Sequence, residues 1–253
     1  MQVDALVIAG GSSDKLRKYS EVAKEALIPI GDKVMVEYVM EAVEGTPGIN
    51  KIAVVGPKEL KNIFADKENL IIAEEGKSAI DSILNGLRLL KPQDRVLIIT
   101  ADIPLISSEA ISGFLEACQD PSIDIYYPIV PKEANEAKYP GIKRTYVTIK
   151  DGTYTGGNAF FVNPNIADRC AETAKKLVKL RKSPLALSSL IGWRFILKLI
   201  TKKVTIKEAE EKFSELLGAK GRVVISQYPE IGMDVDKPSD LQLVNTVIKE
   251  RQT

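Results

Sequence analysis

Short apolar runs alternate with helix-period segments through roughly the first hundred residues, and this rhythm constrains the fold more than any other feature. Apolar runs occupy residues 5–9, 52–56 and 96–100, and helical patterns occupy residues 34–43 and 78–90. The runs are apolar throughout rather than at alternate positions, as in parallel strands that are covered on both faces. The alternation therefore predicts an α/β fold built on a parallel sheet.

The pattern changes in the second half of the chain. Strand candidates at 124–130, 145–149 and 158–162 follow one another with loops between them, which predicts that the sheet becomes mixed. The remaining expected elements are a helical stretch over 166–217, a strand over 223–226 and a closing helix N-capped by Ser239.

The length of 253 residues suits one large domain, because single cores stop growing only near ~250 to 300 residues. We predict one domain over residues 1–253, with residues 165–222 as a helical, basic insertion within it. Segment 169–207 of this insertion holds eleven Lys or Arg and one acidic residue, Glu172, in a chain of net charge +1. Its most apolar part, residues 185–200, is too short to cross a bilayer core of ~30 Å.

Two interpretations of segment 169–207 stay open. Its helices can present a basic face to an anionic partner, including a peripheral contact with a membrane surface. Alternatively, the lysines form a solvated face on ordinary packing helices. The balanced total of 35 basic and 34 acidic residues gives no general attraction to nucleic acid, so no nucleic-acid partner is expected.

The chain contains no histidine. This absence excludes Ser-His-Asp and Cys-His nucleophilic catalysis and the His-ligated zinc hydrolases. Cys118 and Cys170 are far apart in the sequence and are expected to be structural thiols. Because the N-terminal residues lack the features of a signal peptide, we expect a cytoplasmic protein. Catalysis must therefore rely on carboxylates, lysines, hydroxyls, backbone donors and hard metal ions.

A glycine-rich segment directly follows the first predicted strand, at the edge where open α/β sheets bind ligands. Its backbone can approach a phosphate or a base closely, although a tight turn would use the same residues. The segment is neither a Walker A loop nor a dinucleotide-binding Gly-x-Gly-x-x-Gly motif, which argues against a nicotinamide dehydrogenase. Its residues are Ala9, Gly10, Gly11, Ser12 and Ser13.

Carboxylates lie at two further positions of interest. Asp102 follows the buried strand at 96–100, where it can hold a divalent cation; Ser108 is the better candidate to N-cap the next helix, which leaves Asp102 available. Asp234 and Asp236 share one face of an extended segment, and either can complete a metal site with Asp102 or serve as a turn former. Mg²⁺ is the cation that favours one or two carboxylates together with phosphate oxygens.

Taken together, four motifs in this order resemble the nucleotidyltransferases related to molybdenum cofactor guanylyltransferase, the MobA-like NTP transferase superfamily. The resemblance covers residues 5–162 and 223–248. It rests on Ala9-Gly10-Gly11, on Ala26-Leu27-Ile28-Pro29 with Met35-Val36-Glu37-Tyr38, on Ala101-Asp102-Ile103-Pro104 and on Asp234-Val235-Asp236-Lys237-Pro238.

The resemblance implies a fold and a set of sites. The expected fold is a single Rossmann-like mixed sheet flanked by helices, the nucleotide-diphospho-sugar transferase or GT-A-like fold. The glycine segment would wrap the nucleotide, and Asp102 would bind Mg²⁺ with Asp236 as the second ligand and Asp234 as its alternate. Lys77 and Ser78 would neighbour the base or the ribose.

Departures from the family pattern affect the triphosphate site. Ser13 stands where the family usually has a third glycine, and Lys15 stands at the family's arginine. Glu25 occupies the slot of the family's lysine, which is displaced by one position to Lys24. Triphosphate binding and catalytic charge stabilisation are therefore expected from Lys15, Arg17 or Lys24.

A central segment resembles a less characterised branch of the same superfamily. Gly156, Gly157 and Asn158 would turn backbone groups and an amide toward the acceptor. Lys143 and Arg144 would hold its anionic group.

These residues predict a Mg²⁺-dependent nucleotidyltransferase that moves a nucleoside monophosphate from a nucleoside triphosphate to a phosphorylated or anionic acceptor and releases pyrophosphate. A glycosyltransferase of the same fold that uses a sugar nucleotide is one alternative. A non-catalytic module that binds a nucleotide or a membrane surface is another. The acceptor, the base and the oligomeric state stay open.

Overall fold

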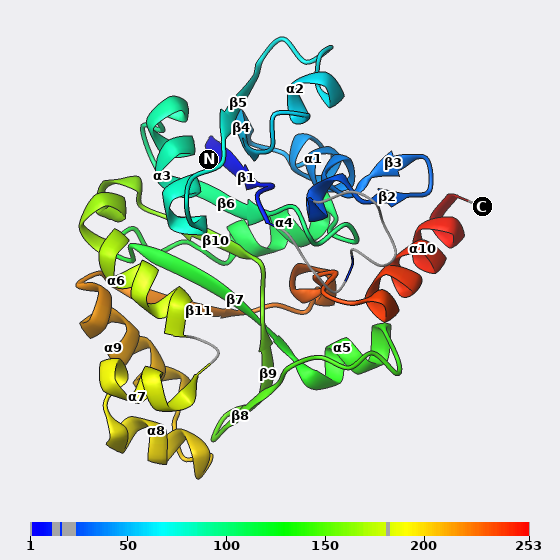
Figure 1. The fold of residues 1–253 in the computed structure, drawn as a ribbon. Coiled ribbons are helices and arrows are strands. Elements are labelled where there is room, and N and C mark those ends of the chain that lie inside the picture. The colour runs from blue at the N-terminus through cyan, green and yellow to red at the C-terminus, as the bar shows by residue number, and fades with distance from the viewer. Residues whose placement is uncertain (1, 12–15, 17–23, 181–182, 253) are drawn as a thin grey trace.

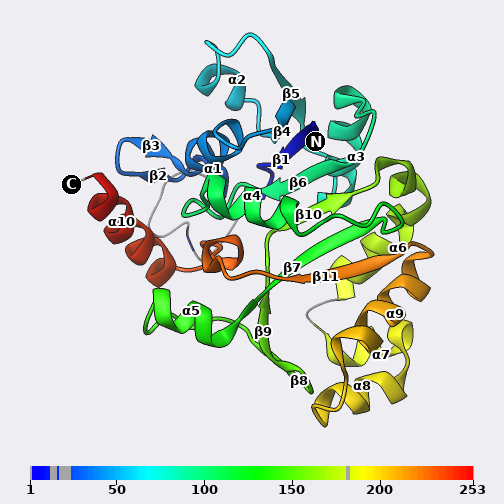
Figure 2. The same cartoon turned by 180° about the vertical axis from the view of Figure 1, so that it is seen from behind.

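A computed structural model of the chain describes residues 2–11, 16, 24–180 and 183–252. Its centre is a nine-stranded mixed sheet with helices on both faces (Figures 1 and 2). The strand order is β5-β4-β1-β6-β10-β7-β9-β8, with β11 paired to β7. The strands are β1 (Val3–Ile8), β4 (Ile49–Gly56), β5 (Leu70–Glu74), β6 (Val96–Thr100), β7 (Ile125–Pro131), β8 (Val147–Ile149), β9 (Gly152–Gly156), β10 (Ala159–Val162) and β11 (Gly221–Ile225).

Strands β5, β4, β1 and β6 run parallel, and β10 is antiparallel to both of its neighbours, β6 and β7. The predicted change from a parallel to a mixed sheet is confirmed. The predicted strand at 145–149 is shortened to β8, and β9 was not predicted at all, because it is a five-residue strand that begins and ends with glycine and contains no apolar run. A two-stranded hairpin of β2 (Pro29–Ile30) and β3 (Lys33–Val34) lies apart from the main sheet.

Helices cover the two faces of the sheet because successive side chains of a strand point to opposite sides. Val3, Ala5 and Val7 of β1 join the core formed with α1 (Met35–Glu44), α2 (Leu60–Ile63) and α4 (Ser108–Glu116). Leu6 and Ile8 of the same strand join the core beneath α3 (Ala79–Leu90). On that second face, α6 (Ala167–Leu180) continues the cover over β7 and β10.

The predicted helical stretch over 166–217 is divided into α6, α7 (Pro184–Ile191), α8 (Trp193–Ile200) and α9 (Ile206–Leu217). Ser183 N-caps α7 by accepting a hydrogen bond from the Ala186 N–H, and Gly192 adopts φ +96° between α7 and α8. Figures 1 and 2 both show α7, α8 and α9 gathered at one end of the molecule, away from the β2–β3 hairpin. None of the helices in the described ranges combines the length and the apolar character needed to cross a membrane.

Two helix starts differ from the predictions. The side chain of Ser107, not that of Ser108, N-caps α4 by accepting from the Ala110 N–H. The last helix, α10 (Pro238–Gln252), begins one residue before Ser239, and the Asp240 carboxylate in its first turn accepts the N–H groups of Asp236 and Lys237. A short helix, α5 (Lys132–Lys138), follows β7 directly.

Candidate active site

Two of the predicted motifs leave the sheet side by side at its carboxyl edge. The Ala9 N–H bonds to the Val55 carbonyl at 2.7 Å, and the Ala101 N–H bonds to the Ile8 carbonyl at 2.9 Å. These bonds extend the pairing of β1 with β4 and β6 by one residue. The glycine segment and the Asp102 turn therefore emerge as neighbours, where open α/β sheets place their ligands.

The Asp102 side chain is held in place by a hydroxyl group. Thr100 Oγ1 donates to Asp102 Oδ1 at 2.5 Å, and the Val235 N–H donates to the Asp102 carbonyl at 2.8 Å. Burial raises the pKa of Asp102 above its ordinary value, and the nearby charge of Asp236 raises it further, whereas Thr100 and Arg144 oppose the rise. Because Ser107 caps α4, the Asp102 carboxylate is not required for helix capping.

Arg144 holds the segment that carries Asp234 and Asp236. Its guanidinium donates to the carbonyls of Gly232 at 2.6 Å and Asp234 at 2.9 Å, and it also forms an ion pair with the Asp234 carboxylate. The Arg144 side chain is only 9% exposed. Burial lowers its pKa, and the surrounding acidic side chains Asp240, Asp236 and Asp102 act in the opposite direction. With Asp234, four carboxylates thus act on one buried guanidinium.

The donor set suits Mg²⁺. Asp102 and Asp236 approach closely enough for the charge of one to raise the pKa of the other, whereas the Asp234 carboxylate is engaged by Arg144. Within the described ranges, no group of three or more His, Cys, Asp or Glu side chains forms a candidate metal cluster. Mg²⁺ is commonly bound by one or two carboxylates with phosphate oxygens and water, so a two-carboxylate site matches its chemistry.

The glycine segment lies against acidic side chains. A Cβ atom at Gly10 would lie 3.0 Å from Glu75 Oε2, and Gly11 has φ +149°, a conformation that favours glycine. Lys24 forms an ion pair with Glu75. This pair brings Lys24 beside the glycine segment and connects it to the end of β5.

The other predicted nucleotide ligands divide into two groups. Ser12, Ser13, Lys15 and Arg17 lie outside the described residues. Lys77 is exposed, and Ser78 N-caps α3 by accepting from the Asp81 N–H at 3.2 Å while its hydroxyl donates to Asp81 Oδ2 at 2.7 Å. Ser78 therefore has a structural role at the N-terminus of a helix that borders the site.

The predicted acceptor residues line one cavity, in which Asn158 is bonded to Thr100. Gly157 is required by close packing, because a Cβ atom there would lie 2.7 Å from Pro128 Cγ. The Asn158 N–H bonds to the Ile231 carbonyl at 2.8 Å, and its own carbonyl accepts from the Thr100 N–H at 3.0 Å. Lys143 is exposed, and its carbonyl accepts from Lys237 Nζ at 2.7 Å.

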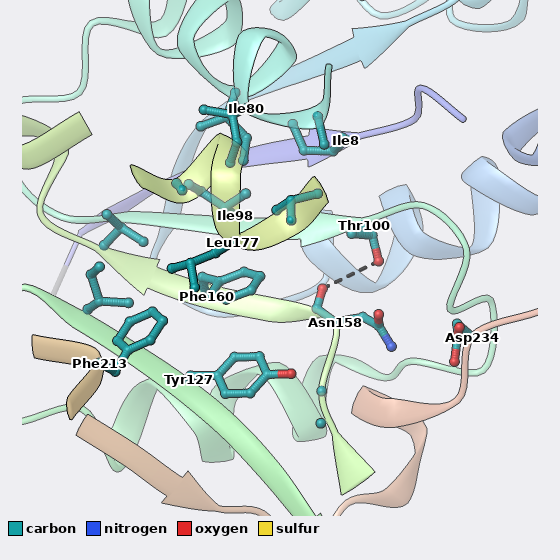
Figure 3. A pocket seen from close by; sticks show the side chains of 18 of the residues that line it. Ile8, Ile80, Ile98, Thr100, Tyr127, Asn158, Phe160, Leu177, Phe213 and Asp234 are labelled. Atoms are coloured by element: carbon teal, nitrogen blue, oxygen red, sulfur yellow. Dashed lines mark hydrogen bonds between the residues drawn. The ribbon is translucent and has the colours of Figure 1, made fainter. Parts of the chain in front are cut away.

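A cavity of about 890 Å³ lies beside the Asp102 turn, and its lining includes the predicted acceptor residues and Asp236 (Figure 3). One end is polar and includes Thr100, Asn158 and Asp234, while the rest extends over the sheet between α3 and α6. Apolar side chains line that part. They include Ile8, Ile80, Ile83, Ile98, Phe160 and Leu177.

Sequence reasoning missed Thr100, Glu75 and the apolar part of the cavity. Thr100 is the last residue of β6, and its hydroxyl two residues before Asp102 was the available signal. Glu75 follows β5 at the same sheet edge, but no motif marked it. The apolar part combines residues of α3, β10 and α6, which no local pattern connects.

Comparison with protein families and curated proteins gives consistent matches. Residues 5–189 match a family model described as a MobA-like NTP transferase domain. The 2-C-methyl-D-erythritol 4-phosphate cytidylyltransferase of Lachnoclostridium phytofermentans is 28% identical over 129 residues, which are 47% of this chain and 53% of that protein. The bifunctional protein GlmU of Thermodesulfovibrio yellowstonii is 23% identical over 134 residues, which are 50% of this chain and 28% of that protein. The chain thus spans about half the length of the first relative and about a quarter of the second.

Solved structures extend the likeness over the whole fold. A hypothetical transferase from Thermus thermophilus has a TM-score of 0.84 and 34% identity, with 95% of this chain and 100% of that chain covered. CMP:2-keto-3-deoxy-manno-octonic acid synthetase in complex with CTP has a TM-score of 0.65 and 14% identity, with coverage of 99% and 100%. The 4-diphosphocytidyl-2C-methyl-D-erythritol synthase of Anaerococcus prevotii has a TM-score of 0.60 and 15% identity, with coverage of 98% and 96%. The predicted Rossmann-like mixed sheet is confirmed.

Proposed function

Because the chain belongs to the MobA-like NTP transferase domain family, as its motifs predicted, we propose that it transfers a nucleoside monophosphate from a nucleoside triphosphate to a phosphorylated or otherwise anionic acceptor. The observation that carries the proposal is that the glycine segment and the Asp102 turn leave neighbouring strands at one sheet edge, where the Val235 N–H bonds the Asp234–Asp236 segment to the Asp102 carbonyl. The relatives named above as cytidylyltransferase and CMP-sugar synthetase support nucleotidyl transfer as the general reaction.

The proposed reaction is an in-line displacement at the α-phosphorus. An acceptor oxygen forms a bond to this phosphorus while the bond from the phosphorus to the α,β-bridging oxygen breaks. The leaving pyrophosphate takes the electron pair of that bond. An acceptor phosphate is already a competent nucleophile, which suits a chain without histidine because no general base is needed.

The residues of this chain would bind and orient the reactants. Asp102 and Asp236 would hold Mg²⁺, whose bound charge stabilises negative charge on the phosphoryl oxygens. The backbone of Gly10 and Gly11 would approach the nucleotide, and Lys24 or Lys15 would bind the triphosphate. Arg144 keeps the Asp234–Asp236 segment in place through its two carbonyl contacts.

Pyrophosphate release tests this proposal. The assay combines Mg²⁺ with ATP, GTP, CTP or UTP and with fractions of cell metabolites and lipid phosphates. We expect release that requires one triphosphate and one fraction and that is lost in Asp102→Ala. Asp94→Ala, on the exposed loop before β6, is the matched control and should keep full activity. Release of a nucleoside diphosphate from a sugar nucleotide, supplied in place of the triphosphate, would indicate the glycosyltransferase alternative. Nucleotide binding without turnover of either donor would indicate the non-catalytic one.

A further inference from the structure

The cavity beside the candidate active site has two chemically different parts. Lys143, Arg144 and Lys237 lie at its polar end together with Asp234 and Asp236. Its larger part is apolar and lies over the face of the sheet, between α3 and α6 (Figure 3). A phosphorylated sugar would hydrogen-bond little in that part, because side chains of Ile, Leu, Val and Phe dominate its lining.

The apolar lining is not closed off from solvent. Val147, Val178 and Phe213 line the cavity and are exposed. Large apolar side chains gathered around an open cavity typically mark a ligand site. The polar end includes Thr100 and Asn158, and the Thr100 hydroxyl bonds to Asp102, so a headgroup at this end would lie beside the Asp102 turn.

We propose that the acceptor is an amphiphilic phosphate whose headgroup lies near Lys143 and Asn158 and whose apolar chain occupies the space between α3 and α6. This inference rests on the proposed function and names its class of acceptor. At the polar end, Arg144 and Lys237 are paired with Asp234 and Asp240, and Lys143 can pair with a phosphate. The apolar lining matches a hydrocarbon chain. Single-chain alkyl phosphates and two-chain lipid phosphates share this chemistry.

Calorimetric titration with monoalkyl phosphates of increasing length, each below its critical micelle concentration, tests the acceptor class. We expect the affinity to rise about fourfold for each buried methylene until the cavity is filled. Dihexanoyl phosphatidate, a soluble two-chain lipid phosphate, distinguishes a diacyl acceptor from a single-chain one. An affinity for monoalkyl phosphates that does not depend on chain length, together with no binding of dihexanoyl phosphatidate, would overturn the proposal, even if a soluble phosphate supports pyrophosphate release.

A variant that fills part of the cavity gives a second test of the acceptor class. Ala174 lines the cavity on α6, so Ala174→Phe should weaken binding of the longest alkyl phosphate by roughly tenfold and leave the shortest one unchanged. Ala137→Phe on the exposed side of α5 is the matched control and should change neither. Equal effects of the two variants on long-chain binding would contradict an apolar chain in this cavity. Thermal unfolding of both variants verifies that they are folded.

A second inference comes from a different surface, on α8. Trp193, Leu197 and Ile200 are 65%, 54% and 70% exposed and recur with the spacing of one helical face. Exposed large apolar side chains so close together are unusual in a surface helix. They lie at the end of the molecule where α7, α8 and α9 gather (Figures 1 and 2).

Cationic side chains accompany this apolar face. Arg194, Lys202 and Lys203 are exposed, and Arg194 packs over the Trp193 ring at 5.6 Å. Lys198 belongs to an ion pair with Glu208 and is not counted among them. An apolar helical face bordered by cations complements the surface of an anionic bilayer. We infer that α8 docks the protein onto anionic lipid membranes.

The fluorescence of Trp193 tests the docking directly, because the chain has one tryptophan. Vesicles of phosphatidylcholine with phosphatidylglycerol should shift its emission to the blue and pellet the protein, and pure phosphatidylcholine vesicles should do so far less. High salt should weaken the binding. Leu197→Glu should abolish it, whereas Leu89→Glu at the 54% exposed position on α3 should not.

A defined result of the vesicle experiment would contradict membrane docking. Unchanged emission and no pelleting with either vesicle, in a protein that still binds nucleotide, would refute the inference. Because this readout needs no turnover, it is independent of the pyrophosphate assay.

Discussion

At the scale of single residues, Thr100 and Asp102 form the most informative pair in the site. Asp102 is held where burial and the charge of Asp236 both disfavour its ionised form, and Thr100 supplies a compensating hydrogen bond. Carboxylates whose pKa is shifted by burial and by a neighbouring charge are common where a protein binds a cation or reacts with a substrate. Loss of the neighbouring hydroxyl or of the carboxylate itself should therefore have measurable effects.

Removing the hydroxyl of Thr100 should impair the reaction without changing the shape of the site. Thr100→Val loses the hydrogen bond to Asp102, and a hydrogen bond to a charged group is worth about 1.5–3 kcal/mol. We expect kcat/KM for pyrophosphate release to fall roughly tenfold or more. Thr100→Ser keeps the donor and should keep most of the activity. Equal losses in both variants would show that packing, not the hydrogen bond, is responsible.

Neutralising Asp102 should make the metal-free protein more stable while abolishing activity. A raised pKa in the folded state means that folding favours the protonated carboxyl. The stability that this group contributes is therefore fully present below the ordinary Asp pKa of about 3.9. It is lost as the pH rises through the higher pKa of the folded protein. Asp102→Asn removes this loss. Its Tm at neutral pH should exceed that of the wild type by roughly 2–4 °C for each kcal/mol gained.

The pH dependence of this difference in Tm is the control for the electrostatic explanation. The difference in Tm between Asp102→Asn and the wild type should shrink as the pH is lowered through the raised pKa of the folded protein, because the wild-type carboxyl then also becomes neutral. A difference that stays constant with pH would disprove the electrostatic origin.

At the scale of elements, Arg144 joins the chain before β8 to the segment before α10. It contacts the carbonyls of Gly232 and Asp234, so two parts of the chain about ninety residues apart are connected at one buried side chain. Both the position of Asp236 and the start of α10 depend on this segment. Arg144 was predicted to bind the acceptor, and that role stays a prediction beside its observed structural contacts.

Removing Arg144 should destabilise the fold strongly. Breaking a buried ion pair costs about 3–5 kcal/mol, because the remaining carboxylates lose their compensating charge. Denaturant unfolding of Arg144→Ala should show a loss of this size. Arg222→Ala, which breaks the solvent-exposed pair with Asp120, should cost no more than about 1 kcal/mol. A small change for Arg144→Ala would mean that the segment is held mainly by its backbone contacts.

Elements with a strong apolar pattern were predicted well, and the reason is burial. The runs at 5–9 and 96–100 became β1 and β6 because both faces of these strands are covered. β9 escaped prediction because it lies beside β8 near the sheet edge, where no apolar run is required. The four-helix division of 166–217 follows the local signals at Ser183, Pro184 and Gly192, which the overall helical composition obscured.

The candidate site was predictable where its residues follow strands directly. Asp102 and the glycine segment lie at the ends of β6 and β1, so their proximity follows from strand order alone. The contacts of Arg144 and the apolar cavity depend on how distant elements approach one another, which spacing along the chain does not encode.

At the scale of the whole molecule, the two sheet faces have different roles. One is filled by the packed core beneath α1 and α4, and the other leaves the cavity between α3 and α6. The candidate active site lies where this cavity meets the carboxyl ends of the parallel strands. Ligand binding at that edge should therefore affect the stability of the whole domain.

Addition of the correct nucleoside triphosphate with Mg²⁺ should raise the Tm of the protein. A ligand that binds only the folded state at 100 times its Kd stabilises it by about 2.7 kcal/mol. The increase should require both components and should fall strongly in Asp236→Ala. Thermal shifts of the same size with Mg²⁺ alone, or with every triphosphate equally, would contradict a specific nucleotide site at this edge.

Strand β7 has a further consequence for how such a protein can diversify. The chain leaves this strand's neighbourhood after β10 and returns to it as β11, with Val162 and Gly221 both paired to Ile125. Everything between them, α6 to α9, thus begins and ends at one fixed point of the sheet. Such a module can be exchanged or lengthened during evolution, because its two junctions stay in register while the candidate active site at the sheet edge is unchanged. Substitutions that change the binding partner can then fall in α6 to α9, and substitutions that change the reaction can fall in the rest of the chain.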